Sequence, residues 1–341
     1  MPMRRKTDRP QPPSPRSRAS AAVARMSWAY FFVLLAIWIF LRTLGDRWWL
    51  GTIMLFGPVW VTALPLAVLV PGALIFHRKS LPILLAAGGV AVFLLMGFCL
   101  PWRAALQRRG IVKPLRVLTC NVHGKSVLNK LIAANDPDIV LLQEWPGTRE
   151  KPVLGVGPWQ VREDGELLIA SRYPIVKSQV FTETTWSDWG GSAARYDIAA
   201  PGGIVHVFNI HLASPHRPFD ALMAGKPAAA QRLDEYLQIR TAQSQLMSQL
   251  ATEAGGDVIL AGDFNTPCEG RVYHRYWSDF SDAYTAAGFG LGHTYFAHGA
   301  SVRIDHVLMG SKWQCRECTV GPYVGSPHRP VVADLERVSG G

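Results

Sequence analysis

Acidic residues are nearly absent from the first 101 positions of the chain. This part contains eleven Lys and Arg residues but only Asp8 and Asp46, whereas residues 102–341 contain 24 basic and 23 acidic residues. The formal charge of +10 therefore belongs almost entirely to the N-terminal part. Because the remainder is close to neutral, its bulk charge gives no argument for a polyanionic partner. The basic excess instead indicates a segment beside a membrane.

Common catalytic motifs are missing as well. The sequence has no G-x-S-x-G string, which disfavours a serine nucleophile on a strand-to-helix turn. It has no G-x-x-x-x-G-K-S/T string, which disfavours a nucleoside-triphosphate hydrolase. The pair Cys315 and Cys318 has no second C-x-x-C, so zinc is weakly indicated. A disulfide and reduced thiols both remain open for Cys268, Cys315 and Cys318.

Long apolar runs are present and follow a basic tail. Residues 1–26 are rich in Pro, Ser and Arg, and we expect a disordered tail there. Spanning a bilayer takes about 20 apolar residues. Three stretches reach or approach this length: 28–44, 48–76 and 81–100. We therefore predict a membrane region over 27–101 with about three transmembrane helices. A buried hairpin of a soluble protein is the alternative; a cleaved signal peptide is disfavoured, because further apolar runs follow the first.

Charges near the ends of these runs predict the orientation. Seven basic residues precede the first run and favour a cytoplasmic N-terminus. Three spans then place a polar linker, 102–114, and a catalytic domain, 115–341, outside the cytoplasm. Four basic residues after the third run argue for the opposite side: Arg103, Arg108, Arg109 and Lys113. The domain would also lie inside if the first run did not span.

The pattern of the globular part predicts many short strands and few helices. Runs rich in Val, Ile and Leu are bounded by Gly, Pro, Asn and Asp, as expected for strands. They cover 115–122, 138–145, 165–172, 204–212, 257–264 and 303–309. Residues 126–134 and 231–251 are predicted to be helical. Several strands are apolar on both faces, which predicts an α+β layered sandwich with both faces of its sheets covered.

Polar residues cluster at the ends of these predicted strands. Asn121 ends the first strand, Glu144 ends the second, and His328 precedes a final strand. Residues two apart on a strand point to the same face. Three such pairs occur: Asn209 with His211, Asp263 with Asn265, and Arg303 with Asp305. Each residue has an ordinary structural interpretation, as a turn former, a buried histidine or an ion pair. Their joint occurrence favours a site.

The residue types at these positions indicate phosphate-ester hydrolysis. Carboxylate and amide oxygens are hard ligands that suit Mg²⁺ or Mn²⁺. A metal neutralises charge on a phosphate, while a carboxylate or histidine activates water and amides hold the remaining oxygens.

The order of these motifs resembles the endonuclease/exonuclease/phosphatase superfamily, the deoxyribonuclease-I-like fold. The matching strings are LTCNVHG, DIVLLQEW, LLIASRYPI, FNIHLASP, VILAGDFNTP, RIDHVLM and SPHRPVVADL, over about 115–336. The resemblance implies a four-layer αββα sandwich of two packed mixed sheets flanked by helices. It also implies a phosphodiesterase, nuclease or phosphatase activity.

The resemblance assigns roles where the motifs match. Glu144 is expected to be the principal metal ligand, with Asn121 helping to bind metal or phosphate. His211 is expected to contact the phosphate. Asp263 is expected to orient or deprotonate the attacking water, and Asn265 is expected to hold that water or the phosphate. Asp305 and His328 correspond to the family's acidic residue and its terminal histidine.

The sequence departs from the family pattern at two positions. Pro327 stands where the family usually has Asp, so a carboxylate and a backbone donor are missing. His123 stands where some relatives carry Asp. These changes are expected to weaken any second metal site and raise the barrier. They leave open one-metal catalysis built on Glu144, with His306 or another nearby group adjusting. SPHRP also occurs at 214–218, but no closing strand follows that copy.

We expect a membrane-anchored, metal-dependent phosphoesterase. The alternatives are a catalytically impaired member that binds phosphate or lipid, and a membrane scaffold whose spans are the functional part. The substrate is open among nucleic acid, a phospholipid head group and a small phosphoester. The loop 182–192, with Trp186 and Trp189, is a candidate cover for the cleft. No obligate protein partner is indicated.

Overall fold

The chain forms two compact units. A computed structural model describes residues 14–106, 113–147, 159–181, 191–297 and 300–338. One unit combines Met1–Ile39 with Trp60–Leu95, and the other combines Phe40–Val59 with Met96–Gly341. The predicted cleft cover with Trp186 and Trp189 lies outside the described residues, apart from Gly191 and Ser192.

The apolar part of the chain forms helices. They are α1 (Pro15–Leu44), α2 (Trp49–Phe56), α3 (Leu66–Phe76) and α4 (Leu81–Gly89), with shorter helical turns at Gly45–Arg47, Val59–Ala63, Arg78–Ser80 and Val90–Leu95. By length and composition, three helical segments could cross a membrane: Pro15–Arg47, Val59–Phe76 and Arg78–Leu95. Helix α1 therefore begins inside the segment 1–26, which was expected to be disordered.

The second apolar run is divided by its sequence. Helix α2 ends at Phe56, and Gly57 continues in an extended conformation before Pro58. Proline lacks the backbone N–H that would continue the helix. The candidate span begins only at Val59, while Trp49–Phe56 belongs to the unit that holds the sheets. The run 48–76, which was predicted as one span, therefore consists of the short helix α2 and a separate candidate span.

The larger unit contains two six-stranded sheets. The first has the order β13-β14-β1-β2-β4-β3 and the second the order β5-β6-β7-β8-β12-β9. Only β1 with β2 and β7 with β8 pair in parallel. The strands are β1 (Leu115–Asn121), β2 (Ile139–Gln143), β3 (Gln160–Asp164), β4 (Leu167–Ser171), β5 (Ile175–Phe181), β6 (Ser192–Ala200), β7 (Gly203–His211), β8 (Val258–Asp263), β9 (Ser281–Asp282), β12 (Asp305–Met309), β13 (Trp313–Val320) and β14 (Val331–Arg337).

The remaining elements cover or connect the sheets. A separate hairpin consists of β10 (Tyr295–Ala297) and β11 (Ala300–Val302). The helices are α5 (Trp102–Leu106), α6 (Leu128–Asn135), α7 (His216–Met223), α8 (Ala229–Glu253), α9 (Arg271–Tyr276) and α10 (Ala283–Ala287). Helices α6 and α8 match the predicted 126–134 and 231–251 closely. All five cysteines are free thiols.

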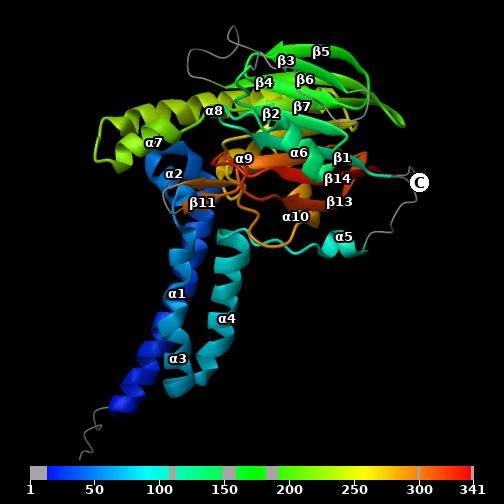
Figure 1. Ribbon diagram of the computed structural model, residues 1–341. Coiled ribbons are helices and arrows are strands. Elements are labelled where there is room, and N and C mark those ends of the chain that lie inside the picture. The colour runs from blue at the N-terminus through cyan, green and yellow to red at the C-terminus, as the bar shows by residue number, and fades with distance from the viewer. Residues whose placement is uncertain (1–13, 107–112, 148–158, 182–190, 298–299, 339–341) are drawn as a thin grey trace, which may run out of the picture. The chain divides into compact units, whose positions relative to one another are not determined.

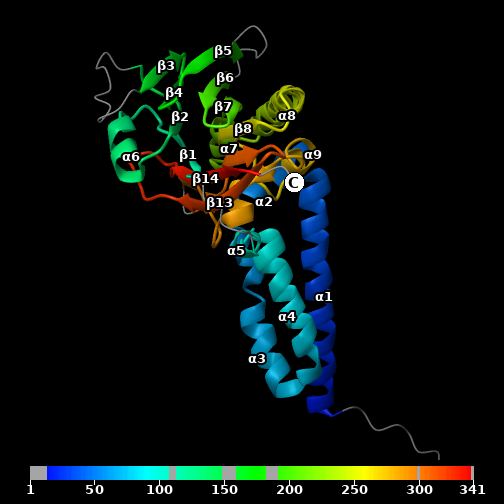
Figure 2. The same cartoon turned by 90° about the vertical axis from the view of Figure 1, so that its right-hand side faces the viewer.

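Three apolar clusters define four layers. One cluster lies between the sheets and includes Val117, Leu141 and Val207. A second joins the outer face of the first sheet to α6, and a third joins the outer face of the second sheet to α8 and α9. Figure 2 shows α6 and α8 on opposite sides with the strands between them. The predicted αββα sandwich of two packed mixed sheets, preceded by apolar helices, is confirmed (Figure 1).

Gly262 is required where β7 and β8 approach each other. Its φ is +147°, and a Cβ atom there would lie 1.9 Å from the carbonyl oxygen of Ile210. No side chain fits such a contact, and this backbone conformation favours glycine. The glycine before Asp263 therefore allows the parallel pairing that sets the position of the Asp263 carboxylate.

The segment between α1 and α2 is anchored in the larger unit by a buried carboxylate. Asp46 is 2% exposed, and its Oδ2 accepts a hydrogen bond from Val272 N at 2.8 Å, at the start of α9. Its Oδ1 lies 4.0 Å from Nη2 of the fully buried Arg240 on α8. The Arg240 guanidinium in turn donates to the backbone oxygen of Asn265. The carboxylate of Asp46 thus offsets a buried cation beside a predicted site residue.

We expect Asp46→Ala to lower the free energy of unfolding by about 3 kcal/mol, because it leaves the Arg240 guanidinium buried without a counter-charge. Thermal unfolding of the full chain in detergent measures the change. Glu253→Ala, on the exposed last turn of α8, is the matched control and should change stability by less than about 0.5 kcal/mol. Equal melting temperatures for both variants would contradict the anchoring role of Asp46.

Candidate active site

The predicted site residues lie where the parallel strands of both sheets end. His211 at the end of β7 is the register partner of Asp263 at the end of β8. Asp263 is in turn opposite Asp305 of β12. In the first sheet, Asn121 is the last residue of β1 and Glu144 directly follows β2. Because the sheets pack face to face, one edge of the sandwich brings these side chains together.

The side chain of Asn121 joins carboxylates from both sheets. Its Nδ2 donates to Glu144 Oε1 at 2.9 Å and to Asp263 Oδ2 at 3.1 Å. Its Oδ1 accepts from the backbone N–H of His123 at 3.0 Å. These bonds fix the orientation of the amide and leave one lone pair of Oδ1 for a ligand.

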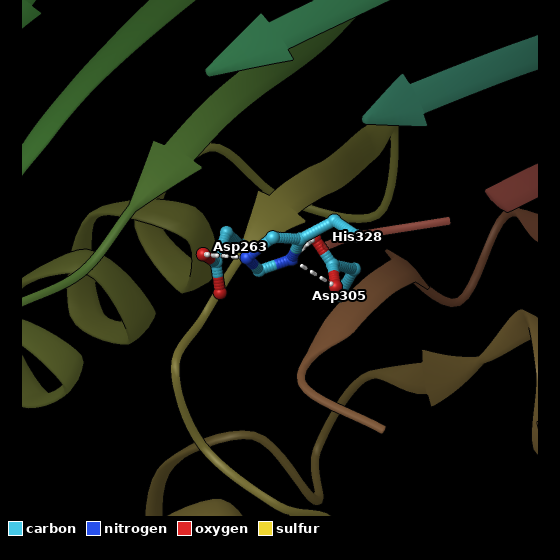
Figure 3. Close-up of side chains that lie close together, drawn as sticks. All are labelled: Asp263, Asp305 and His328. Atoms are coloured by element: carbon cyan, nitrogen blue, oxygen red, sulfur yellow. Dashed lines mark hydrogen bonds and ion pairs between the residues drawn. The ribbon is translucent and has the colours of Figure 1, made fainter. Parts of the chain in front are cut away.

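His328 lies between two buried aspartates, as Figure 3 shows. Its Nδ1 is 2.9 Å from Asp305 Oδ2, and its Nε2 is 3.7 Å from Asp263 Oδ2. Burial lowers the pKa of His328, but the charges of Asp305 and Asp263 outweigh this and raise it to about 9. His328 is therefore a cation at neutral pH, held in orientation by Asp305.

His211 approaches the same carboxylates from β7. Its Nε2 is 3.8 Å from Glu144 Oε1 and 3.9 Å from Asp263 Oδ2. Its Nδ1 lies 2.7 Å from Glu166 Oε1. Burial lowers the pKa of His211, but the hydrogen bond and charge of Glu166 outweigh burial and raise it to about 9. Two imidazolium groups thus face the Asp263 carboxylate.

Asn265 is held by the loop that follows β8. Its backbone N–H donates to Asp263 Oδ1 at 2.9 Å, and its Nδ2 donates to the carbonyl oxygen of Leu212 at 2.8 Å. One N–H of Nδ2 is thereby engaged, so Oδ1 and the second N–H are the groups through which the side chain can act on a ligand. The Asp263 carboxylate is fixed by the same loop, and burial raises its pKa while His328 opposes this.

These side chains line a cavity of about 650 Å³. Its polar lining includes His123, Glu144, Asp263, Asn265 and His328. The volume is that of a typical small-molecule site, with room for a group much larger than a phosphate. All seven predicted site residues therefore lie in or directly against one cavity.

Three other polar residues noted in the sequence have structural roles. Asn209 is buried between the sheets, where its Oδ1 accepts from Gln143 Nε2 at 2.7 Å. Arg303 pairs with the buried Asp282 at 3.2 Å rather than with Asp305. His306 also contacts Asp282, at 3.0 Å, and is buried. Because residues i and i+1 of a strand face opposite sides, His306 points away from Asp305. It does not take the place of the missing carboxylate at Pro327.

The positions that depart from the family pattern are both in the cavity. Pro327 lines it, and Ser326 Oγ donates to the backbone oxygen of Asn121 at 2.6 Å. His123 Nδ1 lies 2.9 Å from Glu144 Oε2. An imidazole thus contacts the Glu144 carboxylate, where a second carboxylate would repel it.

Sequence reasoning missed Glu166, which contacts His211 and also accepts from Ser192 Oγ at 2.7 Å. It directly precedes β4, after a glycine with positive φ. A glutamate at the start of a strand is usually exposed, and nothing in its local sequence marks it. Only the packing of β4 against β7 reveals its contact.

The donor set fits a hard divalent cation. Asp263, Asp305 and His328 bring possible ligand atoms within 4.8 Å of one another, but His328 could bind a metal only after losing its proton. In the described part of the chain, Glu144 and Asp263 form ion pairs with histidines and with no Lys or Arg. The Glu144 side chain is 32% exposed, whereas the trio is buried. A cation that keeps part of its water shell is thus better accommodated at Glu144.

The family model described as the Endonuclease/Exonuclease/phosphatase family matches residues 118–328. This range is more than half of the chain and contains every residue of the site. The chain belongs to this family. The resemblance seen in its motifs is thereby confirmed, and the family is generally divalent-metal-dependent. Among curated protein sequences, none matches the chain.

Solved structures share the fold at low identity. The 3′ phosphatase NExo from Neisseria, bound to a product DNA hairpin, is 18% identical with a TM-score of 0.51, over 65% of this chain and 99% of that chain. A truncated TDP2 from Caenorhabditis elegans is 20% identical with a TM-score of 0.49, over 65% and 97%. A family protein from Bacteroides thetaiotaomicron is 18% identical with a TM-score of 0.49, over 65% and 94%. At 18% identity, the likeness to NExo shows the fold alone.

Glu144 adopts a left-handed backbone conformation, with a φ of +51°. This conformation costs a side-chain-bearing residue about 1–2 kcal/mol and costs glycine little. We therefore expect Glu144→Gly to be about 1 kcal/mol more stable than Glu144→Ala, although both lack the carboxylate. Thermal unfolding of the two variants measures this difference. Equal stability, or a more stable alanine variant, would show that the backbone at Glu144 is not strained.

Proposed function

We propose that the protein is a membrane-anchored hydrolase of phosphate esters that uses a divalent cation, Mg²⁺ or Mn²⁺. The observation that carries this proposal is the shared amide of Asn121, which holds the Glu144 and Asp263 carboxylates together at a cavity. Family membership supports the same reaction class. When bound at Glu144, with Asn121 Oδ1 beside it, the cation would neutralise charge on the phosphate oxygens.

The other side chains of the site each have a separate role in the proposed reaction. Asp263 orients the attacking water and accepts its proton, because its carboxylate is fixed by two hydrogen bonds and faces the cavity. Asn265 Oδ1 holds that water in place. His211 and His328, both protonated, donate to the non-bridging oxygens and stabilise the charge that develops on them. Asp305 orients His328 through Nδ1.

A catalytically impaired member of the fold that binds phosphate or lipid is the alternative. Pro327 is the observation in its favour, because a carboxylate is missing beside His328. Against it stands the rest of the site, in which each predicted catalytic side chain has a partner that orients it. Turnover decides between them: a full chain that binds Mn²⁺ saturably but hydrolyses no phosphoester would favour the alternative.

We also propose that the catalytic domain is extracytoplasmic. Support comes from the seven basic residues that precede the first apolar run and from the three helices able to cross a membrane. An odd number of spans places the two ends of the chain on opposite sides.

We expect Glu144→Gln and His328→Ala each to reduce the hydrolysis of bis(p-nitrophenyl) phosphate by at least about 10²-fold, since each removes a group that acts on the transition state. The full chain is assayed with Mn²⁺ and with Mg²⁺, and thermal unfolding confirms that each variant is folded. Glu253→Gln and His206→Gln are matched controls, because Glu253 is exposed and His206 pairs with Asp197 at the far end of β7. Wild-type turnover by both site variants would refute the assignment.

The orientation predicts which end of the chain a protease can reach. A tag placed after Gly341 should be digested in right-side-out membrane vesicles, whereas a tag before Met1 should be protected until the vesicles are opened. Immunoblotting of the two tags reads the result. Protection of the C-terminal tag and digestion of the N-terminal one would place the domain inside.

A further inference from the structure

The cavity of the site has an apolar wall in addition to its polar one. Three separate segments build this wall: residues 56–58, helix α7 and the hairpin of β10 and β11. The apolar side chains include Phe56, Pro58, Phe219, Met223 and Val302. The rings of Phe56 and Phe219 lie against each other, with centroids 6.1 Å apart. The apolar surface is continuous with Glu144, Asp263 and His328, so one ligand can contact both walls.

The polar groups on the apolar side are already engaged with one another. Tyr295 Oη lies 3.1 Å from His216 Nδ1, and His216 Nε2 lies 3.3 Å from Asp220. Ser301 Oγ lies 2.6 Å from His293 Nδ1. Reading a nucleobase requires hydrogen-bonding groups that are directed at its edges. This side of the cavity therefore suits an aliphatic group better than a base.

The charge of the chain also argues against a nucleic acid as the ligand. Binding to a nucleic acid backbone depends on several Lys or Arg contacts to phosphates. Residues 102–341 carry 24 basic and 23 acidic residues, and the charged side chains that line this cavity, among the described residues, are acidic or histidine. In the part of the cavity that the structure describes, a long polyanion therefore finds no Lys or Arg to bind its phosphates.

One part of the apolar wall adjoins a candidate membrane span in the chain. Phe56, Gly57 and Pro58 belong to the same compact unit as the site, and the next residue, Val59, begins the apolar helix Val59–Phe76. The wall is therefore built partly from the residues that lead into that helix. A cavity made this way is suited to a ligand that has an apolar part.

We propose that the cavity binds phosphoesters that carry an aliphatic chain, with the phosphate at Glu144 and the chain along Phe56, Phe219 and Met223. This inference rests on the proposed function and names its substrate class. The ligand chemistry is that of an alkyl phosphoester, which a membrane phospholipid or a soluble alkyl phosphate would both supply.

A series of esters with one leaving group tests the proposal. Methyl, butyl and hexyl p-nitrophenyl phosphate release the same p-nitrophenolate, so only the chain differs. With the full chain in lipid nanodiscs and Mn²⁺, kcat/KM should rise with chain length, by up to about fourfold for each fully buried methylene. Phe219→Ser should flatten this rise. Phe289→Ser is the matched control, because Phe289 is 70% exposed and is not among the residues that line the cavity. The esters partition into the lipid to the same extent with both variants, so partition cannot cause a difference between them.

A binding measurement separates this inference from the proposed function. Calorimetric titration of methyl-, butyl- and hexylphosphonate into the full chain should show affinity that rises with chain length, and less so for Phe219→Ser. Such a rise without hydrolysis of any ester would support the apolar site and refute the hydrolase. Hydrolysis with flat kcat/KM and flat affinity would overturn the inference and leave the hydrolase standing.

Two further assays identify the source of the alkyl phosphoester and test nucleotides as the competing class of substrate. Phosphate release from phosphatidic acid in the same nanodisc would identify a membrane lipid as the source, whereas turnover of the soluble esters alone would identify a soluble alkyl phosphate; either supports the proposal. Thymidine 5′-p-nitrophenyl phosphate represents nucleotides. A kcat/KM for this ester more than tenfold above that of the hexyl ester would overturn the proposal.

Discussion

The site depends on one amide that lies between two carboxylates. Glu144 follows a strand of the first sheet and Asp263 ends a strand of the second, and Asn121 Nδ2 donates to both. Two negative charges held this close repel each other unless donors and cations surround them. His211 and His328 supply part of that compensation, and a cation bound at Glu144 would add to it. The packing of two sheets, which brings the strand ends together, is thus coupled to a requirement for positive charge beside the two carboxylates, which the histidines meet in part.

Much of the fold and site could be predicted because both follow from local patterns. Apolar runs bounded by turn residues mark strands, and a polar residue at the end of a buried parallel strand has few places to point. Asp263 and Asn265 are an example: their strand is buried on both faces, so the loop beyond it is where their side chains act. Glu166 could not be found this way, because its partner His211 lies 45 residues further along the chain and on another sheet.

The boundary of the apolar N-terminal region was harder to predict for a related reason. Residues 49–56 are as apolar as a span, and composition does not distinguish a helix in lipid from one packed against protein. The structure assigns them to the unit of the sandwich, where they lead to the apolar wall of the cavity. The sequence contains Gly57 and Pro58, which interrupt the apolar run. Their role as a boundary becomes clear only from the structure, in which the helices before and after them belong to different units.

The buried carboxylate of Asp46 has a consequence for how the chain is made. Its hydrogen-bond donor, Val272, is 226 residues further along the chain. During synthesis the end of the first apolar helix is therefore complete long before α8 and α9 exist to receive it. The hydrogen bond of Asp46 therefore cannot form until α9 has been synthesised, and a chain that stops before α9 leaves this carboxylate without its donor.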